Sequence, residues 1–323
     1  MARQQDRPRR RGGRTVINST VVTLVFLANG FVTSAAPTPS PRLTPLATPA
    51  PLTPFVPGAR GQGQWQPAGR RVAGHAAIYV TTLRLPADPM VNAGVAWLDP
   101  RLLRARLYSG SLSPGGFSWH YSAPIESAAA RTLVAAFAGG FLLPASHGGY
   151  LSEGRLVAPL RVGAASLVIY ANGSWAVGQW GRDVGMTPRV VAVRQNLTLL
   201  VDHARPVSGL SASDISVWGA ALNGVANTWR SAFGVTAAGG YVYAAGPMTV
   251  VELAQVLVRA GAVRAMVLDM NPLWPVFATY DPVKPDGLAT PANGTDLLST
   301  MLQSPGRFFQ PAYSRDFVTM SAR

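Results

Sequence analysis

Short apolar runs, each ended by glycine, proline, asparagine or aspartate, fill the chain from about Val72 to Arg323. With 33 glycines and 27 prolines in 323 residues, few stretches can form a helix of ordinary length. Runs of apolar and β-branched residues between turn residues favour strands. Roughly 250 residues of uniform texture suit one domain. We therefore expect a single α+β domain with a large, mostly antiparallel sheet and few helices.

Turn chemistry places two hairpins in this domain. Ala165–Trp180 is predicted to turn at Asn172-Gly173, which supplies the left-handed backbone of a two-residue connection. Ser231–Gly246 is predicted to turn at Gly239-Gly240. Further strands are expected at Ala76–Leu85 and at residues 92–100, 102–110, 190–196 and 197–203.

The clearest helix begins at Thr249, where "TVVE" forms a capping box in which the threonine and Glu252 cap each other's amides. Apolar residues then repeat on one face, and Gly261 is a natural left-handed stop. Residues 125–137 and 294–303 are weaker helix candidates. The Thr249 helix leads into an apolar strand that ends at Asp269, a place where α/β sheets commonly present site residues.

The pattern of the N-terminal residues predicts an export segment. Residues 1–14 hold six arginines and one aspartate, and residues 15–36 carry no charge. This pattern predicts a signal peptide or membrane anchor over residues 1–36. Residues 37–71, rich in Pro, Thr and Gly, are expected to be a disordered linker, and residues 72–323 the folded domain. The domain is then extracellular or at the cell surface, and it contacts the membrane through the N-terminal segment if that segment is retained as an anchor rather than cleaved.

Composition excludes several classes of function. The chain has no cysteine, so it offers neither disulfides nor a thiol nucleophile, and it has only four histidines. Metal-ligand spacing, phosphate loops and a dinucleotide fingerprint are absent from the sequence. We expect no cofactor and no metal. The net charge is +14, but beyond the basic head it is diffuse and no nucleic-acid module is present, so no nucleic-acid partner is expected.

Four segments hold candidate site residues. Phe137–Arg155 offers the backbone amides of Gly139 and Gly140 together with His147, and Trp180–Asn196 offers Arg194. Thr228–Val235 places Arg230 on a strand, and Ala265–Phe277 contains Asp269. Each also has a structural interpretation: glycine turns, surface ion pairs, a strand-edge charge and a turn-forming aspartate, respectively.

Taken in order, these segments resemble the phosphodiester glycosidase family. Ala138-Gly139-Gly140-Phe141-Leu142 is similar to the family's Asn-Gly-Gly-Phe-Phe segment, and Arg230–Val235 with Gly239-Gly240 is similar to its Arg-Thr/Ser-Ala-x-Gly-Val strand pair. The unit from Thr249 to Asp269 matches the family's helix and strand. Two departures stand out: Ala138 replaces the asparagine, and Met270-Asn271-Pro272-Leu273-Trp274 replaces a Gly-Gly-Gly-Ser-Ser tail.

The resemblance implies a hydrolase that cleaves a sugar from a sugar-1-phosphodiester in cell-envelope or extracellular glycans. Asp269 would be the acid/base and His147 a second proton carrier, while the substrate-binding set would be Arg230, Arg194, Gly139, Gly140, Asn271 and Trp274. The partner is then a carbohydrate or sugar phosphate. The alternative is a non-catalytic module that binds wall glycans or an anionic polymer, which the replaced glycine tail and the positive charge favour.

Overall fold

The computed structural model of the chain describes residues 43–58, 60–116, 118–219 and 227–323. The expected export segment and the first residues of the expected linker lie outside these ranges. Leu43–Arg323 forms one compact unit. Within the described ranges, no helix combines the length and the apolar character needed to cross a membrane.

The largest sheet has eight strands in the order β1-β2-β3-β14-β13-β15-β11-β12, and the pairs between neighbours are antiparallel. The predicted hairpin at Gly239-Gly240 joins β13 to β14. In spatial order the strands are β1 Gln66–Val72, β2 His75–Arg84, β3 Asn92–Leu98, β14 Tyr241–Met248, β13 Thr228–Thr236, β15 Ala262–Val267, β11 Leu199–Asp202 and β12 Arg205–Pro206.

Two five-stranded antiparallel sheets complete the domain. The small sheet has the order β7-β6-β10-β8-β9, and the predicted turn at Asn172-Gly173 joins β8 to β9. Its strands are β7 Arg155–Ala158, β6 Tyr150–Ser152, β10 Val190–Gln195, β8 Ala165–Tyr170 and β9 Trp175–Gln179. The third sheet consists of β17 Gly294–Asp296, β16 Phe277–Tyr280, β5 Leu133–Ala138, β18 Phe317–Ala322 and β4 Leu103–Tyr108, in that order. The predicted α+β fold with few helices is confirmed.

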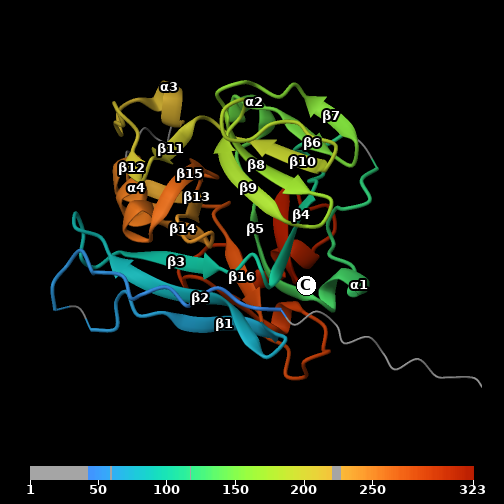
Figure 1. Cartoon of the computed structure of the whole chain (residues 1–323), viewed down its shortest axis with the longest axis horizontal. Coiled ribbons are helices and arrows are strands. Elements are labelled where there is room, and N and C mark those ends of the chain that lie inside the picture. The colour runs from blue at the N-terminus through green and yellow to red at the C-terminus, as the bar shows by residue number, and fades with distance from the viewer. Residues whose placement is uncertain (1–42, 59, 117, 220–226) are drawn as a thin grey trace, which may run out of the picture. The chain divides into compact units, whose positions relative to one another are not determined.

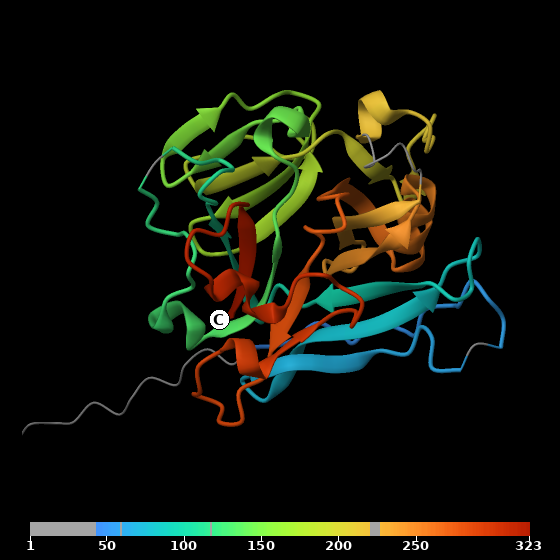
Figure 2. The same cartoon turned by 180° about the vertical axis from the view of Figure 1, so that it is seen from behind.

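One apolar core joins the three sheets. In Figure 1, β1–β3 run along the lower edge, β13–β15 lie at the upper left and the small sheet at the upper right. Seen from behind in Figure 2, the C-terminal strand (red) lies directly beneath the small sheet (green). Leu98, Phe137, Ile169 and Phe233 belong to the same buried cluster although they come from β3, β5, β8 and β13. Burial of such side chains is the main driving force for this packing.

Helix α4 (Val250–Arg259) has the predicted capping box. The Glu252 amide donates to Thr249 Oγ1 at 3.2 Å, and Glu252 Oε2 accepts from the Thr249 amide at 2.9 Å. Gly261 follows with φ +86°, as the stop signal requires. The buried face of α4, including Leu253 and Leu257, packs in a second apolar cluster with the large sheet.

The expected linker is wrong for residues 43–71, because this segment packs on the domain. Leu52 is buried, the Leu46 amide donates to Asp99 Oδ2 at 2.7 Å, and β1 already begins at Gln66. Proline disfavours helices and central strands, but it leaves an extended segment that can lie on a surface and bond through its remaining backbone groups. The folded domain therefore begins before Val72.

Both weaker helix predictions are also wrong. Residues 125–137 contain only one helical turn, α1 (Ser127–Ala130), followed by the fully buried strand β5. Residues 294–303 begin with β17 and contain no helix. A short apolar run does not distinguish a buried strand from a helix by its periodicity. The other short helices of the described residues are α2 (Leu143–Ser146), α3 (Ile215–Trp218), η2 (Pro291–Asn293) and η3 (Pro305–Phe309).

Candidate functional site

Four segments that are distant in the sequence meet where β5 and β15 end and β18 begins. The Gly139 amide, just after β5, donates to the carbonyl of Asp316 at 2.9 Å. The amide group of Asn196, just after β10, donates to the carbonyls of Val267 and Leu268 at 2.9 and 3.1 Å. The structure therefore brings the glycine pair, the end of β10, the Asp269 turn and the chain before β18 into one cluster.

A buried ion pair lies at the centre of this cluster. Arg194 Nε donates to Asp316 Oδ2 at 2.8 Å and Nη2 donates to Oδ1 at 3.2 Å, and neither side chain is exposed. Arg194 also donates to the carbonyls of Gln195 and Phe141. Burial raises the pKa of Asp316, and the charge and hydrogen bonds of Arg194 oppose that rise. Protein acceptors occupy all three nitrogens of Arg194. The guanidinium therefore has a structural role beneath the site.

The predicted glycine pair packs directly against the ion pair. A Cβ on Gly139 would lie 2.1 Å from Asp316 Oδ2. At Gly140, whose φ is +153°, a Cβ would lie 3.1 Å from Arg194 Nη2. A side chain at Gly139 would displace the carboxylate, so the close approach of the backbone to the ion pair explains this glycine.

Asp269 follows β15 and is almost fully buried. Its Oδ1 accepts from the amides of Met270 and Asn271 at 2.8 and 3.1 Å. Asp269 therefore forms the turn that its structural interpretation predicted. Oδ2 is buried, accepts no hydrogen bond from the described residues, and lies 3.7 Å from Arg315 Nη1. Burial raises the pKa of Asp269 to about 6, and the positive charge of Arg315 limits the rise.

Aromatic rings hold the arginines around Asp269. The guanidinium carbons of Arg315 and Arg307 lie 4.6 and 5.7 Å from the centroid of the Trp274 ring. The Tyr313 ring meets Trp274 edge-on at 6.2 Å and lies 5.1 Å from the Arg307 guanidinium carbon. Stacking of this kind fixes the direction of a guanidinium. We refer to Asp269, Trp274, Tyr313, Arg307, Arg315 and the Arg194–Asp316 pair as the basic-aromatic cluster, which has three arginines and two carboxylates.

Arg230 lies on β13, next to the residue that contacts Asp269, but its side chain points to the opposite face of that strand. Its Nε donates to the Met248 carbonyl at 3.2 Å and its Nη1 lies 3.9 Å from Met270 Sδ. Burial lowers its pKa to about 10. The next residue, Ser231, accepts from the Asp269 amide at 3.1 Å. Because successive side chains of a strand point to opposite faces, Arg230 leaves β13 on the face opposite Ser231.

Two other predicted residues lie outside the core of the cluster. His147 is exposed at the end of α2, with φ 50°, and no hydrogen bond or ion pair links it to another described side chain of the candidate site. Asn271 is half-buried, and its Oδ1 accepts from the Leu273 amide at 3.1 Å. The structure thus brings Asp269, Trp274, Arg194, Gly139 and Gly140 together, and among the described residues no hydrogen bond or ion pair joins His147 to them.

Sequence reasoning missed four residues of the cluster, Arg307, Tyr313, Arg315 and Asp316. They lie in a C-terminal segment for which the pattern indicated only docking of Phe308, Phe309 and Phe317. Phe308 and Phe317 are buried, as expected. The available signal was the adjacent Arg315-Asp316 directly before an apolar strand, in a region with few charges.

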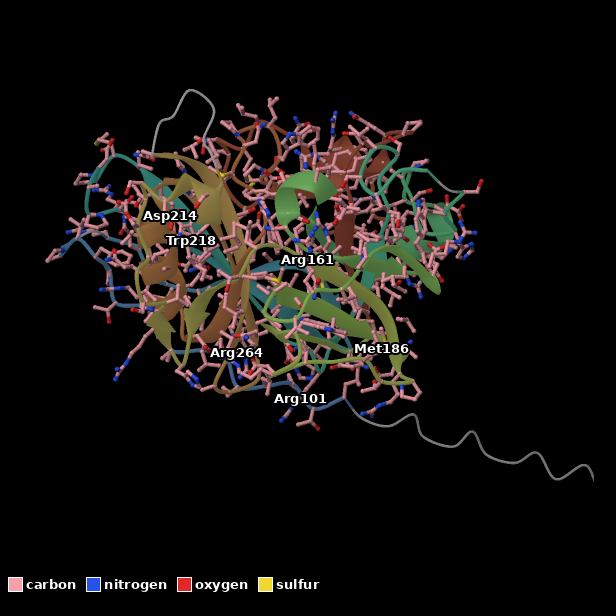
Figure 3. All side chains as sticks on the ribbon, turned by 90° about the horizontal axis from the view of Figure 1, so that it is seen from above. Arg101, Arg161, Met186, Asp214, Trp218 and Arg264 are labelled. Carbon is pink, nitrogen blue, oxygen red and sulfur yellow. The ribbon has the colours of Figure 1, made fainter. Side chains whose placement is uncertain are left out.

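Three other polar residues of the Trp180–Asn196 segment, Arg182, Asp183 and Gln195, make structural contacts. Arg182 forms surface ion pairs with Asp183 and Asp202, each at 2.8 Å. Arg264 of β15, which Figure 3 shows at the junction with the small sheet, lies 3.7 Å from Asp183. Gln195 accepts from the amides of Gly149 and Arg161, each at 2.8 Å.

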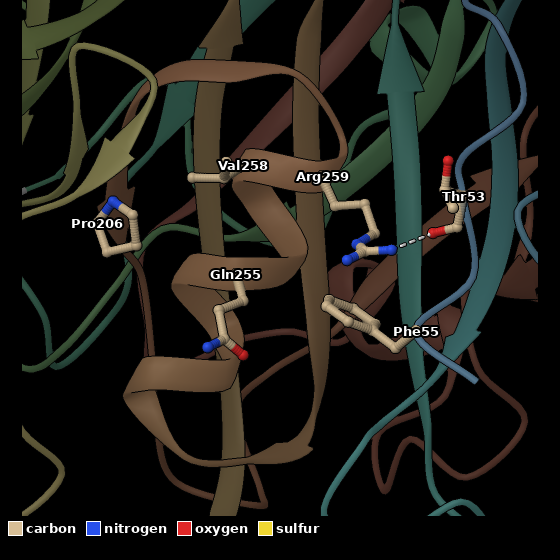
Figure 4. Close-up of a pocket in the computed structure, with 6 residues that line it drawn as sticks. All are labelled: Thr53, Phe55, Pro206, Gln255, Val258 and Arg259. Atoms are coloured by element: carbon tan, nitrogen blue, oxygen red, sulfur yellow. Dashed lines mark hydrogen bonds between the residues drawn. The ribbon is translucent and has the colours of Figure 1, made fainter. Parts of the chain in front are cut away.

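Two of the hollows in the described surface differ in size and in lining. The larger, of about 680 Å³, lies between α4 and the N-terminal segment (Figure 4). Arg259 crosses it, donating to the Thr53 carbonyl at 2.8 Å and stacking on Phe55 at 3.9 Å, and no candidate site residue lines it. The smaller, of about 200 Å³, is lined by four serines, Trp119 and Tyr313, together with small residues. Among the described residues, no three His, Asp or Glu side chains are grouped as metal ligands would be.

Comparison with known proteins gives distant structural similarities. No protein-family model and no curated protein sequence matches the chain. The catalytic domain of zebrafish N-acetylglucosamine-1-phosphodiester alpha-N-acetylglucosaminidase, auto-inhibited by its pro-peptide, is similar with a TM-score of 0.46 at 14% identity over 80% of this chain and 88% of that one. A hypothetical protein from Synechocystis has a TM-score of 0.41 at 12% identity, covering 77% and 63% of the two chains. An exported protein from Burkholderia pseudomallei has 0.36 at 14%, covering 72% and 74%.

Proposed function

We propose that the chain is an exported hydrolase of the phosphodiester glycosidase type, which cleaves a sugar from a sugar-1-phosphodiester in cell-envelope or extracellular glycans. The observation that supports it is the buried Asp269 Oδ2, which lies 3.7 Å from Arg315 and belongs to a carboxyl whose pKa is raised to about 6. A strongly perturbed carboxyl beside a specific charge partner is typical of functional sites.

The chemistry of such a substrate suits this cluster. Hydrolysis breaks the bond between the anomeric carbon and the phosphate oxygen, water adds to that carbon, and a phosphate monoester leaves. The phosphate is a weakly basic leaving group, so stabilisation of its charge matters more than strong proton donation. Arg315, fixed against Trp274, supplies a guanidinium fork that matches phosphate oxygens. Arg307 adds a second positive charge on the same ring.

Asp269 is the proton-transfer group in this proposal. In its protonated form it donates to the leaving oxygen, and in its ionised form it orients the attacking water. Arg315 thereby takes the phosphate-binding role that the sequence suggested for Arg230 and Arg194. The Arg194–Asp316 pair and Gly139 hold the backbone on which Asp269 and Arg315 lie. Trp274 orients the arginines, and His147, which is exposed and makes no hydrogen bond or ion pair with the described residues of the cluster, has no assigned step.

A binding module for an anionic glycan is the second candidate. The side chains of Asp269 and Arg315 are only 2% and 8% exposed. So little exposure of Asp269 disfavours turnover, and the excess of arginines over carboxylates in the basic-aromatic cluster suits electrostatic attraction of an anionic polymer.

The deciding experiment measures sugar release from a panel of sugar-1-phosphate alkyl esters by the full chain, with Asp269→Asn, Arg315→Lys and the surface variant Asp202→Asn. The hydrolase predicts that Asp269→Asn loses at least a hundredfold in kcat/KM and that Arg315→Lys mainly raises KM. Asp202→Asn should match the parent protein. Absence of turnover across the panel, with Arg315-dependent retention of an anionic glycan, would support the binding module instead.

A further inference from the structure

The two faces of the small sheet pack against different parts of the molecule. Leu167 and Ile169 of β8 belong to the core that joins the three sheets. Val168, which lies between them, points to the opposite face, because successive side chains of a strand alternate. On this outer face Val168 and Val193 of β10 form a small apolar cluster of their own together with Trp180. The outer face therefore has a cover that is separate from the main core.

Residues 180–189 supply part of this cover. They join the end of β9, which pairs with Ala165 at the start of β8, to the beginning of β10, which pairs with Tyr170 at the end of β8. The connection therefore runs the whole length of β8. It does so along the outer face, because Trp180 and Val184 pack in the outer apolar cluster. We refer to residues 180–189 as the crossing segment.

Backbone hydrogen bonds fix the crossing segment against the connection between β7 and β8. The Trp180 amide donates to the Ala164 carbonyl at 2.9 Å, and the Gly163 amide donates to the Trp180 carbonyl at 2.9 Å. The side chains of this connection also reach the crossing segment, since a Cβ on Gly181 would lie 3.1 Å from Val162 Cγ1. The two connections therefore form one continuous layer on the small sheet.

Large aliphatic side chains of this layer are exposed. Val162 is 82% exposed, and Met186 of the crossing segment, which Figure 3 labels, is 55% exposed. Leu156 of β7 is 57% exposed and pairs with Leu151, whose side chain packs against the outer apolar cluster. Because directly paired residues share a face of a sheet, Leu156 also lies on the outer face. Single exposed apolar residues are ordinary, but a group of them indicates an interaction surface.

Arginines accompany these aliphatic residues. Arg161 directly precedes Val162, and Arg189 follows Met186 by three positions. Both arginines are exposed, and neither forms an ion pair with another described residue. We refer to these four residues together with Leu156 as the outer surface. It combines apolar side chains with two positive charges that lack a counter-charge of their own.

The nearby carboxylates do not cancel this charge. Residues 150–196 contain five arginines, of which Arg194 is buried, and two carboxylates. Asp183 forms an ion pair of 2.8 Å with Arg182. Glu153 accepts from two backbone amides at 2.9 and 2.8 Å. The outer surface therefore keeps a positive potential, which is complementary to an anionic partner.

We propose that the outer surface docks the folded domain on an anionic lipid membrane. Leu156, Val162 and Met186 enter the headgroup region, and Arg161 and Arg189 bind lipid phosphates. A hydrated anionic polymer would satisfy the arginines, but only a lipid phase also removes the aliphatic side chains from water. The contact is made by the folded domain itself, so it depends neither on the predicted N-terminal anchor nor on the proposed hydrolysis.

A fluorescent label at one position of the full chain tests the docking separately from any anchor. The chain has no cysteine, so Thr187→Cys in the crossing segment accepts a single nitrobenzoxadiazole label, whose emission rises when it leaves water. Thr295→Cys, an equally exposed position on β17 of the third sheet, is the matched control. On vesicles of phosphatidylcholine with phosphatidylglycerol we expect the emission at Thr187 to rise about threefold and that at Thr295 to stay unchanged. Pure phosphatidylcholine should give little rise at either position.

Variants then test the charge match and the apolar contact. At the lipid concentration that gives half of the maximal rise, Arg161→Gln with Arg189→Gln should reduce the rise at Thr187 about threefold. Met186→Ser should also reduce it, because less apolar surface enters the membrane. Arg71→Gln with Arg84→Gln, which removes two exposed arginines from β1 and β2, should have no effect.

Three outcomes would overturn the membrane contact. The label at Thr187 could stay in water on anionic vesicles, or the labels at Thr187 and Thr295 could respond equally, which would show general adsorption. The two arginine pairs could have equal effects, which would leave the outer surface without a special role. A rise with soluble dextran sulfate as large as that with vesicles would assign the surface to an anionic polymer instead of a lipid.

Discussion

The guanidinium of Arg194 and the carboxylate of Asp316 form a completely buried ion pair, with Nε 2.8 Å from Oδ2. The two residues are 122 positions apart, one on β10 of the small sheet and the other directly before β18 of the third sheet. The pair therefore links two sheets beside Asp269. A buried pair of this kind contributes little over an apolar replacement, but the loss of one partner leaves an uncompensated charge.

Asp316→Asn should consequently lower the free energy of unfolding by about 3–5 kcal/mol. The amide keeps the shape of the carboxylate but leaves Arg194 buried without a counter-charge. Urea denaturation measures the change. Asp202→Asn is the matched control, since it removes a partner of the partly exposed Arg182 and should cost about 0–1 kcal/mol. Equal losses in the two variants would show that Arg194 does not depend on Asp316.

Gly139→Ala should destabilise the protein by about 1–3 kcal/mol, as overpacking typically does. The added methyl group would lie 2.1 Å from Asp316 Oδ2, so the ion pair or the backbone must move. Gly185→Ala is the control, because a Cβ there meets nothing within 4 Å and its φ is not in the left-handed region. Thermal unfolding of both variants measures the difference, and a neutral Gly139→Ala would contradict the close packing described here.

Local chemistry explains which parts of the fold the sequence predicted. The turns at Asn172-Gly173 and Gly239-Gly240 and the capping box at Thr249 each depend on neighbouring residues, and all three are present. Leu133–Ala138 was misassigned because its conformation depends on burial between β16 and β18, which the short apolar run does not reveal. The packed segment from Leu43 was missed for a similar reason, since contacts such as that of Leu46 with Asp99 join residues distant in sequence.

The site was predictable only where a local pattern marks it. As the sequence indicated, Asp269 follows an apolar strand. That strand, β15, ends at Val267, two residues before Asp269. The role of Arg315-Asp316 depends on a partner 122 residues away. Arg182-Asp183 is the same dipeptide, yet it forms surface ion pairs. Only the tertiary fold distinguishes the buried pair from the exposed one.

Thr249→Ala should lower stability by about 0.5–2 kcal/mol through loss of the cap at the start of α4. The Glu252 amide loses its acceptor, and Glu252 Oε2 loses the hydroxyl that donates to it at 2.9 Å. Thr249→Ser keeps the hydroxyl and should recover most of the loss. Thr187→Ala, at an exposed loop position, should change stability by less than about 0.5 kcal/mol. Urea denaturation of the three variants tests the cap, and equal effects at Thr249 and Thr187 would exclude it.

Asp269 should make stability fall as the pH rises. Its pKa is about 6 in the folded chain against an ordinary value of 3.8, so between these values the folded state retains a proton that the unfolded state releases. The retained proton contributes about 3 kcal/mol to the free energy of unfolding. This contribution is fully present below about pH 4 and is lost as the pH rises through 6. Asp269→Asn cannot ionise, and its stability relative to the parent should therefore increase by that amount between pH 4 and pH 7.

The same titration should control catalysis. If the protonated Asp269 donates to the leaving oxygen, kcat/KM of the parent protein falls above about pH 6 as the carboxyl ionises. Asp296 offers a matched control, because burial raises its pKa to about 7 and it lies on β17 outside the basic-aromatic cluster. Asp296→Asn should alter the pH dependence of stability and leave the pH–rate profile unchanged. A profile that moves with Asp296, or a parent rate that stays level from pH 5 to pH 8, would remove Asp269 from the role of proton donor.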